Sequence, residues 1–397
     1  MKSTLSHQRT DNSLVKSVNS QYYEKLMRFN DYTIIETVGN LYKVDGFDNY
    51  NQLLDINAVF SACPNYAPVD RTGMGLGPIR HSPERAWSIP TQQLTLAQAM
   101  QQRVAQLCES KQKINLLWSG GIDSTAIAVA FLQHAPDLAQ CRIVYSPWST
   151  YEHPEFFQLL KQVPNLELLD NSGEAYLNMD LDGIVVSGNT GDEMHASLDA
   201  SFFTKHGFDF LSTPWQDFFY QHKSDSNFIE FCKTHFAQSG REITTVLEAR
   251  WWFYLSTKLT SIINCTNLAL FTADAKQFDP KRLIGFFNCD CYEQFIYFNV
   301  DQLILSNNYA TWRQFLKDYC YQYDGFDDWR VNKTKFGSNQ IQSYTFKKQI
   351  LNNARNIMLL DNGERVATPN LPLFSQHEWD CIKHQYVHVF RKPDALA

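Results

Sequence analysis

The segment Ser119–Ser124 (SGGIDS) has residue types and spacing that could bind phosphate. Gly120 and Gly121 lack a Cβ, so the backbone can turn tightly there and approach an anion closely. A helix that begins near Ser124 would offer unpaired N–H groups and the positive end of its dipole. The hydroxyl groups of Ser119, Ser124 and Thr125 add further donors. Together these features predict a phosphate-binding loop, with a glycine-rich turn that holds no ligand as the alternative.

Asp123 sets this segment apart from the lysine-containing phosphate loops of many nucleotide-binding proteins. A carboxylate beside a polyphosphate is favourable only if a cation lies between them, and Mg2+ is the usual one. The segment therefore predicts Mg2+-dependent binding of a nucleoside polyphosphate.

A second polar segment, Val186–Glu193 (VSGNTGDE), follows an apolar run and ends in two carboxylates, Asp192 and Glu193. Open α/β sheets bind their ligands at the carboxyl ends of the strands. If both apolar runs are strands of one parallel sheet, we expect this segment to lie beside Ser119–Ser124. A turn that caps a helix is the simpler alternative.

A third segment, Trp329–Gly337 (WRVNKTKFG), could supply the positive charge that the loop lacks. Lysine suits this role because its ammonium group is a movable point charge. We assign the role to Lys335, with Lys333 and Arg330 as the next candidates. The alternative is a basic loop in solvent.

The elements that must position these residues alternate in type along the chain. Apolar patterns predict strands at 114–118, 142–145, 166–169 and 183–187 and helices at 95–108, 125–134 and 155–162. Such alternation predicts an α/β fold with a parallel sheet covered on both faces. After residue 195 strand signals are few, and helices predicted at 247–263 and 310–321 indicate a helical carboxy-terminal lobe. Residues 22–60 read as a small α+β region, followed by an irregular proline-rich connection over 61–90.

Composition excludes several classes of protein. The 397 residues are 44% hydrophobic and 14% aromatic, which rules out general disorder. A net charge of -7 makes nucleic acid an unlikely partner. No apolar run approaches a membrane span of about 20 residues, and the first residues are polar. Nine scattered cysteines predict a reducing cytoplasm, with Cys289 and Cys291 packing as small apolar residues.

All three segments resemble motifs of one enzyme group. SGGIDS resembles the pyrophosphate loop (PP-loop) of the N-type ATP pyrophosphatases. Ser187–Glu193 resembles the S-G-x-G-x-D-E signature of asparagine synthetases and β-lactam synthetases, and Thr334–Gly337 resembles the T-K-x-G stretch of β-lactam synthetases. The resemblance covers about residues 91–340. It implies an adenine nucleotide alpha-hydrolase type of sheet in a synthetase domain over 91–397, with its PP-loop at 119–124, after a small amino-terminal region over 1–90.

The resemblance also implies a function, that of an ATP-dependent, AMP-forming carbon–nitrogen ligase. A substrate carboxylate would attack the α-phosphate of ATP, and an amine would then displace AMP. Asp123 and Asp192 would hold Mg2+, and Lys335 and Glu193 would be the catalytic candidates. The residues implied in nucleotide binding are Trp118, Ser119, Gly120, Gly121, Asp123, Ser124, Tyr145, Ser146, Ser187 and Gly188.

The sequence departs from this family in ways that bear on the amine. Lys2 follows Met1, where glutamine-dependent asparagine synthetases have a nucleophilic cysteine. The region over 1–90 is thus at most a glutaminase remnant, and the amine would be a substrate amino group or ammonia from a separate source. Thr190 occupies the second glycine position of the signature. Asn189 stands where asparagine synthetases have a glutamate and β-lactam synthetases a tyrosine.

Since an asparagine cannot act as a base near pH 7, another group must activate the amine. Glu193 and His195 are the neighbouring candidates. Two other functions stay open at this point. One is an RNA- or nucleotide-modifying PP-loop enzyme, and the other is a degenerate nucleotide-binding protein that has lost turnover.

Overall fold

The computed structural model describes residues 86–171, 181–195, 209–222, 226–259, 282–303 and 313–333, with 357–359, 365–367 and the single residues Gln52, Arg71, Thr72 and Met74. The α+β region expected over 22–60 lies outside these ranges, apart from Gln52. Lys335 also lies outside them.

A five-stranded parallel sheet organises the fold, with the strand order β3-β2-β1-β4-β5. The strands are β1 (Ile114–Trp118), β2 (Cys141–Tyr145), β3 (Glu167–Asp170), β4 (Ile184–Ser187) and β5 (Leu283–Gly285). The central strands β1 and β4 are almost entirely buried, as expected where helices cover both faces of a sheet. The predicted α/β class with a parallel sheet is therefore confirmed.

The predicted strands lie within one residue of the observed ones at each end. β5 was not predicted, because a three-residue strand is too short to show a periodic pattern. It pairs with β4 from a distant part of the chain, with Val185 opposite Leu283. The expectation of few strands after residue 195 thus missed one edge of the sheet.

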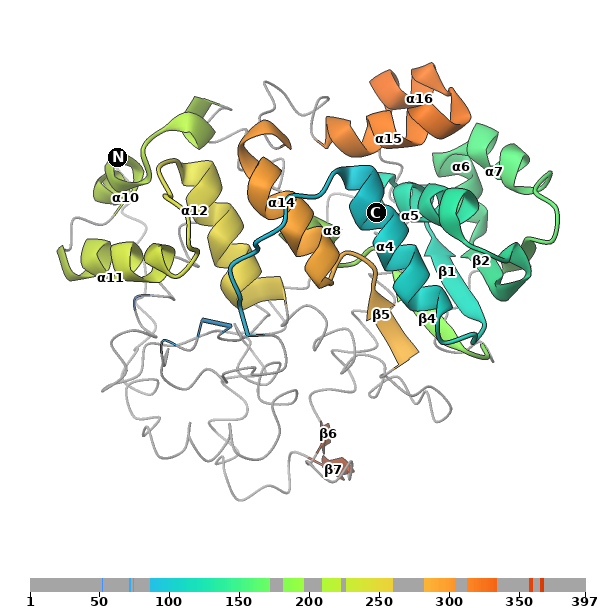
Figure 1. Ribbon diagram of the computed structural model, residues 1–397, viewed down its shortest axis with the longest axis horizontal. Helices are drawn as coiled ribbons and strands as arrows, with labels where there is room; N and C mark the ends of the chain where they lie inside the picture. Colours follow the sequence, from blue (N-terminus) through green and yellow to red (C-terminus); the bar gives the residue numbers. More distant parts are fainter. Residues whose placement is uncertain are drawn as a thin grey trace, which may run out of the picture.

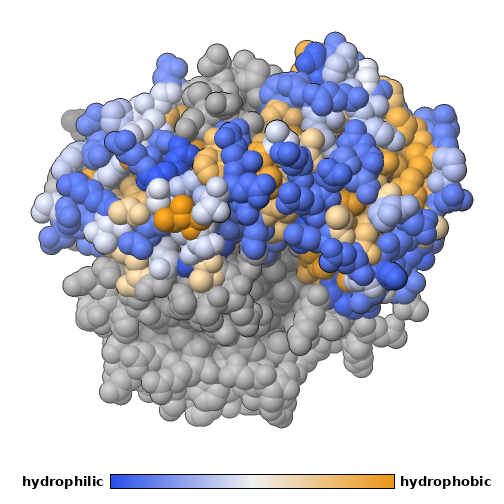
Figure 2. Space-filling model, viewed as in Figure 1, coloured by the Kyte–Doolittle hydropathy of each residue, from blue (hydrophilic) through white to orange (hydrophobic). Residues whose placement is uncertain are grey.

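Helix α4 (Leu96–Cys108) begins at a capping box, in which Thr95 and Gln98 satisfy each other's backbone N–H groups. Its buried residues recur at helical spacing, namely Ala99, Met100, Val104 and Leu107. α4 packs against α5 (Ile122–His134) and α14 (Asp290–Leu303). Its polar side faces outward, and Figure 2 shows a largely hydrophilic surface over this part of the molecule.

The remaining helices fall into two groups. Short helices follow the strands of the sheet: α6 (Pro147–Glu152), α7 (Pro154–Leu160) and α8 (Gly191–Met194). The later helices are α10 (Trp215–His222), α11 (Ser226–Ala237), α12 (Val246–Phe253), α14, α15 (Gln314–Asp324) and α16 (Asp327–Asn332). In Figure 1, α10–α12 gather on one side, the sheet lies on the other, and α14 lies between them.

Two of the later helices differ from their predicted ranges. The helix expected over 247–263 is α12, which continues as a π-helix over Tyr254–Lys258. The helix expected over 310–321 is α15, which begins at Gln314 and ends at Asp324, just before Gly325, a residue with positive φ. A pair of antiparallel strands, β6 (Ile357–Leu359) and β7 (Arg365–Ala367), is described separately from the main sheet. Within the described residues, no helix is long and apolar enough to cross a membrane.

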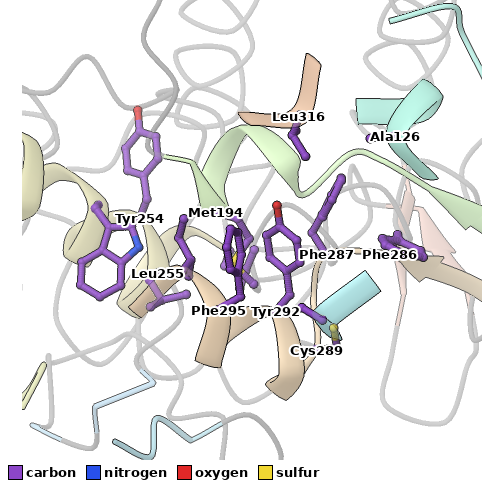
Figure 3. Packing of buried hydrophobic residues seen from close by; sticks show 14 of the residues in the cluster. Ala126, Met194, Tyr254, Leu255, Phe286, Phe287, Cys289, Tyr292, Phe295 and Leu316 are labelled. Carbon is purple, nitrogen blue, oxygen red and sulfur yellow. The ribbon is translucent and has the colours of Figure 1, made fainter. Parts of the chain in front are cut away.

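Aromatic side chains from several elements form one continuous core. Trp251 and Trp252 of α12 and Tyr292 of α14 are fully buried. Figure 3 shows Tyr292 between Phe287 and Phe295, with Cys289 nearby. Cys289 and Cys291 are both buried, in agreement with their expected packing role.

Candidate functional site

The site lies where the chain reverses its direction across the sheet. From β1 the chain moves outward to β2 and β3, and it then returns to place β4 on the other side of β1. The strand order therefore reverses between β1 and β4, and the loops that follow these two neighbouring strands leave the sheet at the same edge. Doubly wound sheets bind their ligands at such a switch point.

The loop after β1 requires glycine at position 120. Gly120 has a φ of +73°. A Cβ there would lie 2.4 Å from Cβ of Glu152 and 2.5 Å from the carbonyl oxygen of Ser149. The loop is thus packed directly against α6, and Gly120 gives it both the required φ and the required space.

Two serine hydroxyls hold this loop closed. The backbone N–H of Ser119 donates to Oγ of Ser124 at 3.1 Å, and the two Oγ atoms lie 3.0 Å apart. Oγ of Ser124 also donates to the carbonyl of Gly121 at 3.1 Å. Gly121 precedes α5 and provides no side-chain cap, so the first N–H groups of this helix are suited to an anion.

Helix α5 begins at Ile122, earlier than the predicted start at Thr125. Asp123 therefore lies in the first turn of the helix rather than in the loop before it. A carboxylate is favourable in this position because it faces the positive end of the helix dipole.

The loop after β4 packs directly on Asp123. A Cβ on Gly188 would lie 3.1 Å from Cβ of Asp123, and a Cβ on Gly191 would lie 2.6 Å from its Oδ1. The structure thus brings together the two segments that the sequence predicted to be neighbours. Asp192 and Glu193 lie within α8, immediately after this contact, and Asn189 is exposed.

Asp123 has a partner that the sequence did not indicate. Arg313, the residue before α15, donates from its guanidinium to Oδ2 of Asp123. The other oxygen, Oδ1, is buried and has no hydrogen-bond partner among the described residues. Nδ1 of His195 lies 3.9 Å from Oδ1, beyond hydrogen-bond distance.

His195 is completely enclosed. Its Nε2 lies 2.7 Å from the hydroxyl of Tyr292. Burial lowers the pKa of His195 to about 4, although the Asp123 carboxylate opposes this shift. Burial also raises the pKa of Tyr292 well above its usual value. Both side chains are therefore neutral near pH 7.

Lys333, the alternative to Lys335, forms an ion pair with a residue that packs against the loop. Nζ of Lys333 lies 3.1 Å from Oε1 of Glu152, and the two side chains are only 5% and 1% exposed. Glu152 is the residue that packs against Gly120. Lys317 of α15 is also buried, and its pKa is lowered by burial and by the positive charge of Lys333.

Helix α16 is anchored beside this ion pair. The ring of Trp329 stacks on His153 with 4.4 Å between ring centroids and 9° between planes. His153 is fully buried, and burial together with Lys333 lowers its pKa to about 3. Arg330, the other alternative to Lys335, instead pairs with Asp318 and Asp327.

The remaining nucleotide-binding candidates lie at the carboxyl ends of their strands, but their side chains are largely used in packing. Trp118 is buried, donates from Nε1 to Oγ1 of Thr125 and stacks on Phe157. The indole of Trp118 is thus engaged in packing, and the implied contact of this residue with a nucleotide stays a prediction. Ser146 caps α6, and the ring of Tyr145 packs on Phe157.

Ser187 ends β4, and its carbonyl accepts from the N–H of Phe286. The buried side chain of Thr190 packs against Gly285 at the end of β5. The loop after β4 is thus held on one side by β5 and on the other by Asp123. This packing places Thr190, the departure from the glycine signature, away from Asp123.

Sequence reasoning missed Arg313 and Glu152. Neither lies in a segment with recognisable spacing, and each reaches the loop only through the fold. Lys333 had a signal, since it lies in the basic segment and was an alternative to Lys335.

The described residues contain no group of three or more histidine, cysteine or acidic side chains that could hold a metal ion. Asp123 is a carboxylate of the kind that Mg2+ takes, often one or two together with phosphate oxygens, and its Oδ2 pairs with Arg313. In comparisons with known proteins, no family model, curated protein or solved structure matches the chain.

Proposed function

We propose that this protein is an ATP-dependent ligase that forms AMP and joins a carboxylate to an amine. The observation that carries the proposal is the contact between the two loops, in which Gly188 and Gly191 pack on Asp123 at the switch point of the sheet. The strand order and the glycine loop after β1 support a PP-loop ATPase type of fold. The helices α10–α16 support a helical carboxy-terminal lobe.

The polyphosphate of ATP would bind over the start of α5. The first N–H groups of the helix and the backbone around Gly120 and Gly121 are suited to the phosphate oxygens. Asp123 and Asp192 would hold Mg2+, which neutralises charge on the phosphates when bound. Arg313 and Lys333 add positive charge from the other side of the loop.

Arg313 and Lys333 pair with Asp123 and Glu152, respectively. Phosphate oxygens would compete for both cations. Because phosphoryl transfer is catalysed mainly by positioning and charge neutralisation, Arg313 and Lys333 would contribute most to catalysis. We assign the main catalytic charge to Lys333, while Lys335 stays a prediction because it lies outside the described residues.

The reaction has two steps. A substrate carboxylate oxygen attacks the α-phosphorus, the bond to the β-phosphate oxygen breaks, and pyrophosphate leaves. The amine then attacks the acyl carbon, loses a proton and displaces AMP. Asn189 is exposed in the loop after β4, and it can orient the amine by hydrogen bonds without removing its proton.

The test is to incubate the protein with ATP, Mg2+ and a metabolite extract, to measure pyrophosphate and to identify adenylates by mass spectrometry. We expect pyrophosphate and an acyl-adenylate from the wild type and neither from Asp123→Asn. Asp137→Asn is the matched control. It makes the same chemical change at the cap that precedes β2, and asparagine keeps the cap.

A second candidate function is nucleotide binding without turnover, which Asn189 favours because it replaces the groups linked to amine handling in the resembling families. ATP binding with no pyrophosphate release from any carboxylate would establish this function instead. Release that depends on RNA and not on a carboxylate would favour the nucleic-acid-modifying alternative. Absence of ATP binding would refute the proposal altogether.

A further inference from the structure

A buried polar pair outside the three sequence segments faces the loop carboxylate. His195 lies immediately after α8, and Tyr292 lies on α14. Nε2 of His195 and the hydroxyl of Tyr292 are 2.7 Å apart. Figure 3 shows the Tyr292 hydroxyl pointing from α14 toward α8. Both side chains are buried. Since buried polar groups are normally hydrogen-bonded, each polar atom of this pair should have a partner.

Aromatic rings surround His195, and its second ring nitrogen, Nδ1, faces the carboxylate of Asp123. The rings of Phe287, Tyr292 and Phe315 lie against the imidazole with centroid separations of 5.5, 5.7 and 5.1 Å. Nδ1 has no hydrogen-bond partner among the described residues, and the polar atom it faces is Oδ1 of Asp123. Oδ1 is likewise buried and without a hydrogen bond in the described part of the chain.

The hydrogen-bond network assigns the tautomer of His195. Tyr292 keeps its proton because burial disfavours the phenolate. If its hydroxyl donates to Nε2, the imidazole proton must be on Nδ1, and it then faces the carboxylate. The opposite tautomer would leave two buried acceptors, Nδ1 and Oδ1, facing each other, which is electrostatically unfavourable.

We propose that His195, oriented by Tyr292, is a positioning residue that directs its Nδ1–H toward Oδ1 of Asp123. Oδ2 then remains as the oxygen that exchanges between Arg313 and a nucleotide-bound Mg2+. The role of Oδ2 toward Mg2+ rests on the proposed function, whereas the tautomer does not. Nδ1 and Oδ1 are 3.9 Å apart while Oδ2 is paired with Arg313.

The start of α15 contacts Asp123 through Arg313 and contacts His195, which faces the other oxygen of Asp123, through Phe315. Arg313 binds Oδ2, and Phe315, two residues later, packs on His195. A shift at the start of α15 would therefore change the partner of Oδ2 and the packing around the group that faces Oδ1 together.

The first test is the tautomer in the full-length protein, with 15N-labelled histidine and long-range proton–nitrogen NMR spectra. We expect the Nδ1–H form for His195 in the wild type and a shift toward the Nε2–H form in Tyr292→Phe. Tyr292→Phe keeps the ring and removes only the hydroxyl. A wild-type protein with its proton on Nε2 would overturn the inference whether or not the protein binds ATP.

The second test is the Mg2+ dependence of binding of a non-hydrolysable ATP analogue, measured by calorimetry. His195→Leu removes the N–H, whereas His195→Asn keeps an amide N–H near the position of Nδ1. Mutation of a residue that hydrogen-bonds to a metal ligand typically lowers the affinity for the metal by about 10- to 100-fold. We expect a rise of this size in the Mg2+ requirement for His195→Leu, and a requirement within a few-fold of wild type for His195→Asn.

Binding of the analogue without Mg2+ should be the same in both His195 variants. Equal losses in His195→Leu and His195→Asn, with both folded, would show that the N–H is not the active feature. If His195→Leu does not fold, Tyr292→Phe takes its place, and an unchanged Mg2+ requirement there would contradict the inference. If the wild type binds no nucleotide, the proposed function fails while the tautomer result still decides the positioning role.

Discussion

Arg313 and Asp123 are 190 residues apart in the chain and form an ion pair at the carboxyl end of β1. The arginine has a φ of 56°, in the left-handed region, and it immediately precedes α15. Its side chain is only 11% exposed, so it has little freedom to point elsewhere. The pair therefore joins the start of α15 to the start of α5, directly over the glycine loop.

Arg313→Ala is expected to weaken ATP binding. Arginine presents several donors in a planar fork that matches phosphate oxygens, and hydrogen bonds to charged groups are worth about 1.5–3 kcal/mol. Since about 1.4 kcal/mol corresponds to a tenfold change, the expected loss is roughly 10- to 100-fold in affinity by calorimetry.

Arg330→Ala is the matched control for this change, because Arg330 lies on the neighbouring helix α16 and pairs with Asp318 and Asp327 and not with Asp123. ATP affinity should be unchanged in that variant. Similar losses in both arginine variants would show that the net positive charge of the protein, and not the position of Arg313, determines binding.

Gly120→Ala and Gly325→Ala separate backbone strain from steric conflict. Both glycines have positive φ, 73° and 70°, but a Cβ on Gly325 meets nothing within 4 Å. We expect Gly325→Ala to lose about 1 kcal/mol of unfolding free energy and to keep ATP binding. Gly120→Ala should lose about 1–3 kcal/mol more and bind ATP poorly, because α6 must move. Urea unfolding and calorimetry measure the two effects, and equal behaviour of the variants would exclude the steric account.

Lys333→Met and Lys335→Ala test which lysine acts in adenylation. We expect Lys333→Met to slow pyrophosphate release by roughly 100-fold or more while ATP binding changes only a few-fold, as for loss of one preorganised stabilising group. Lys335→Ala should retain a larger part of the rate. The reverse order would return the role to Lys335.

Lys333→Met leaves the Glu152 carboxylate buried without its partner, which can cost about 3–5 kcal/mol of stability. The double variant Glu152→Gln with Lys333→Met removes this cost, so it serves if the single variant does not fold. A double variant that is folded and fully active would remove Lys333 from the mechanism.

His153 should make the protein less stable in acid. Its pKa is about 3 in the folded protein, against about 6.5 in the unfolded chain, so the unfolded state takes up the proton first. Its stabilising contribution is complete above about pH 6.5 and is lost as the pH falls toward 3. From pH 6.5 to 5 the loss is about 2 kcal/mol.

His153→Asn removes this contribution while keeping an acceptor for the N–H of Phe156 at the start of α7. Urea unfolding at pH 7 and pH 5 should show a smaller difference in the variant, by about 2 kcal/mol. An equal pH dependence in both proteins would show that His153 is not the group responsible.

Much of the sheet and the glycine loop could be predicted from the sequence because their signals are local. Strands β1–β4 are apolar runs, and Gly120 with Gly121 lies between one such run and a helix. The contact between the loops after β1 and β4 could be expected because parallel strands place their carboxyl ends at one edge. The start of α5 was less predictable, since Ile122 and Asp123 suit a loop or a first helical turn equally well.

The tertiary structure alone decided the electrostatics of the site. Arg313 has no local signature, and its contact with Asp123 depends on how α15 packs against α5. Lys333 reaches Glu152 because Trp329 stacks on His153, a contact between residues that no periodic pattern relates. Hydrophobic periodicity specifies which face of an element is buried, whereas the partner that covers this face is selected by packing of the whole chain.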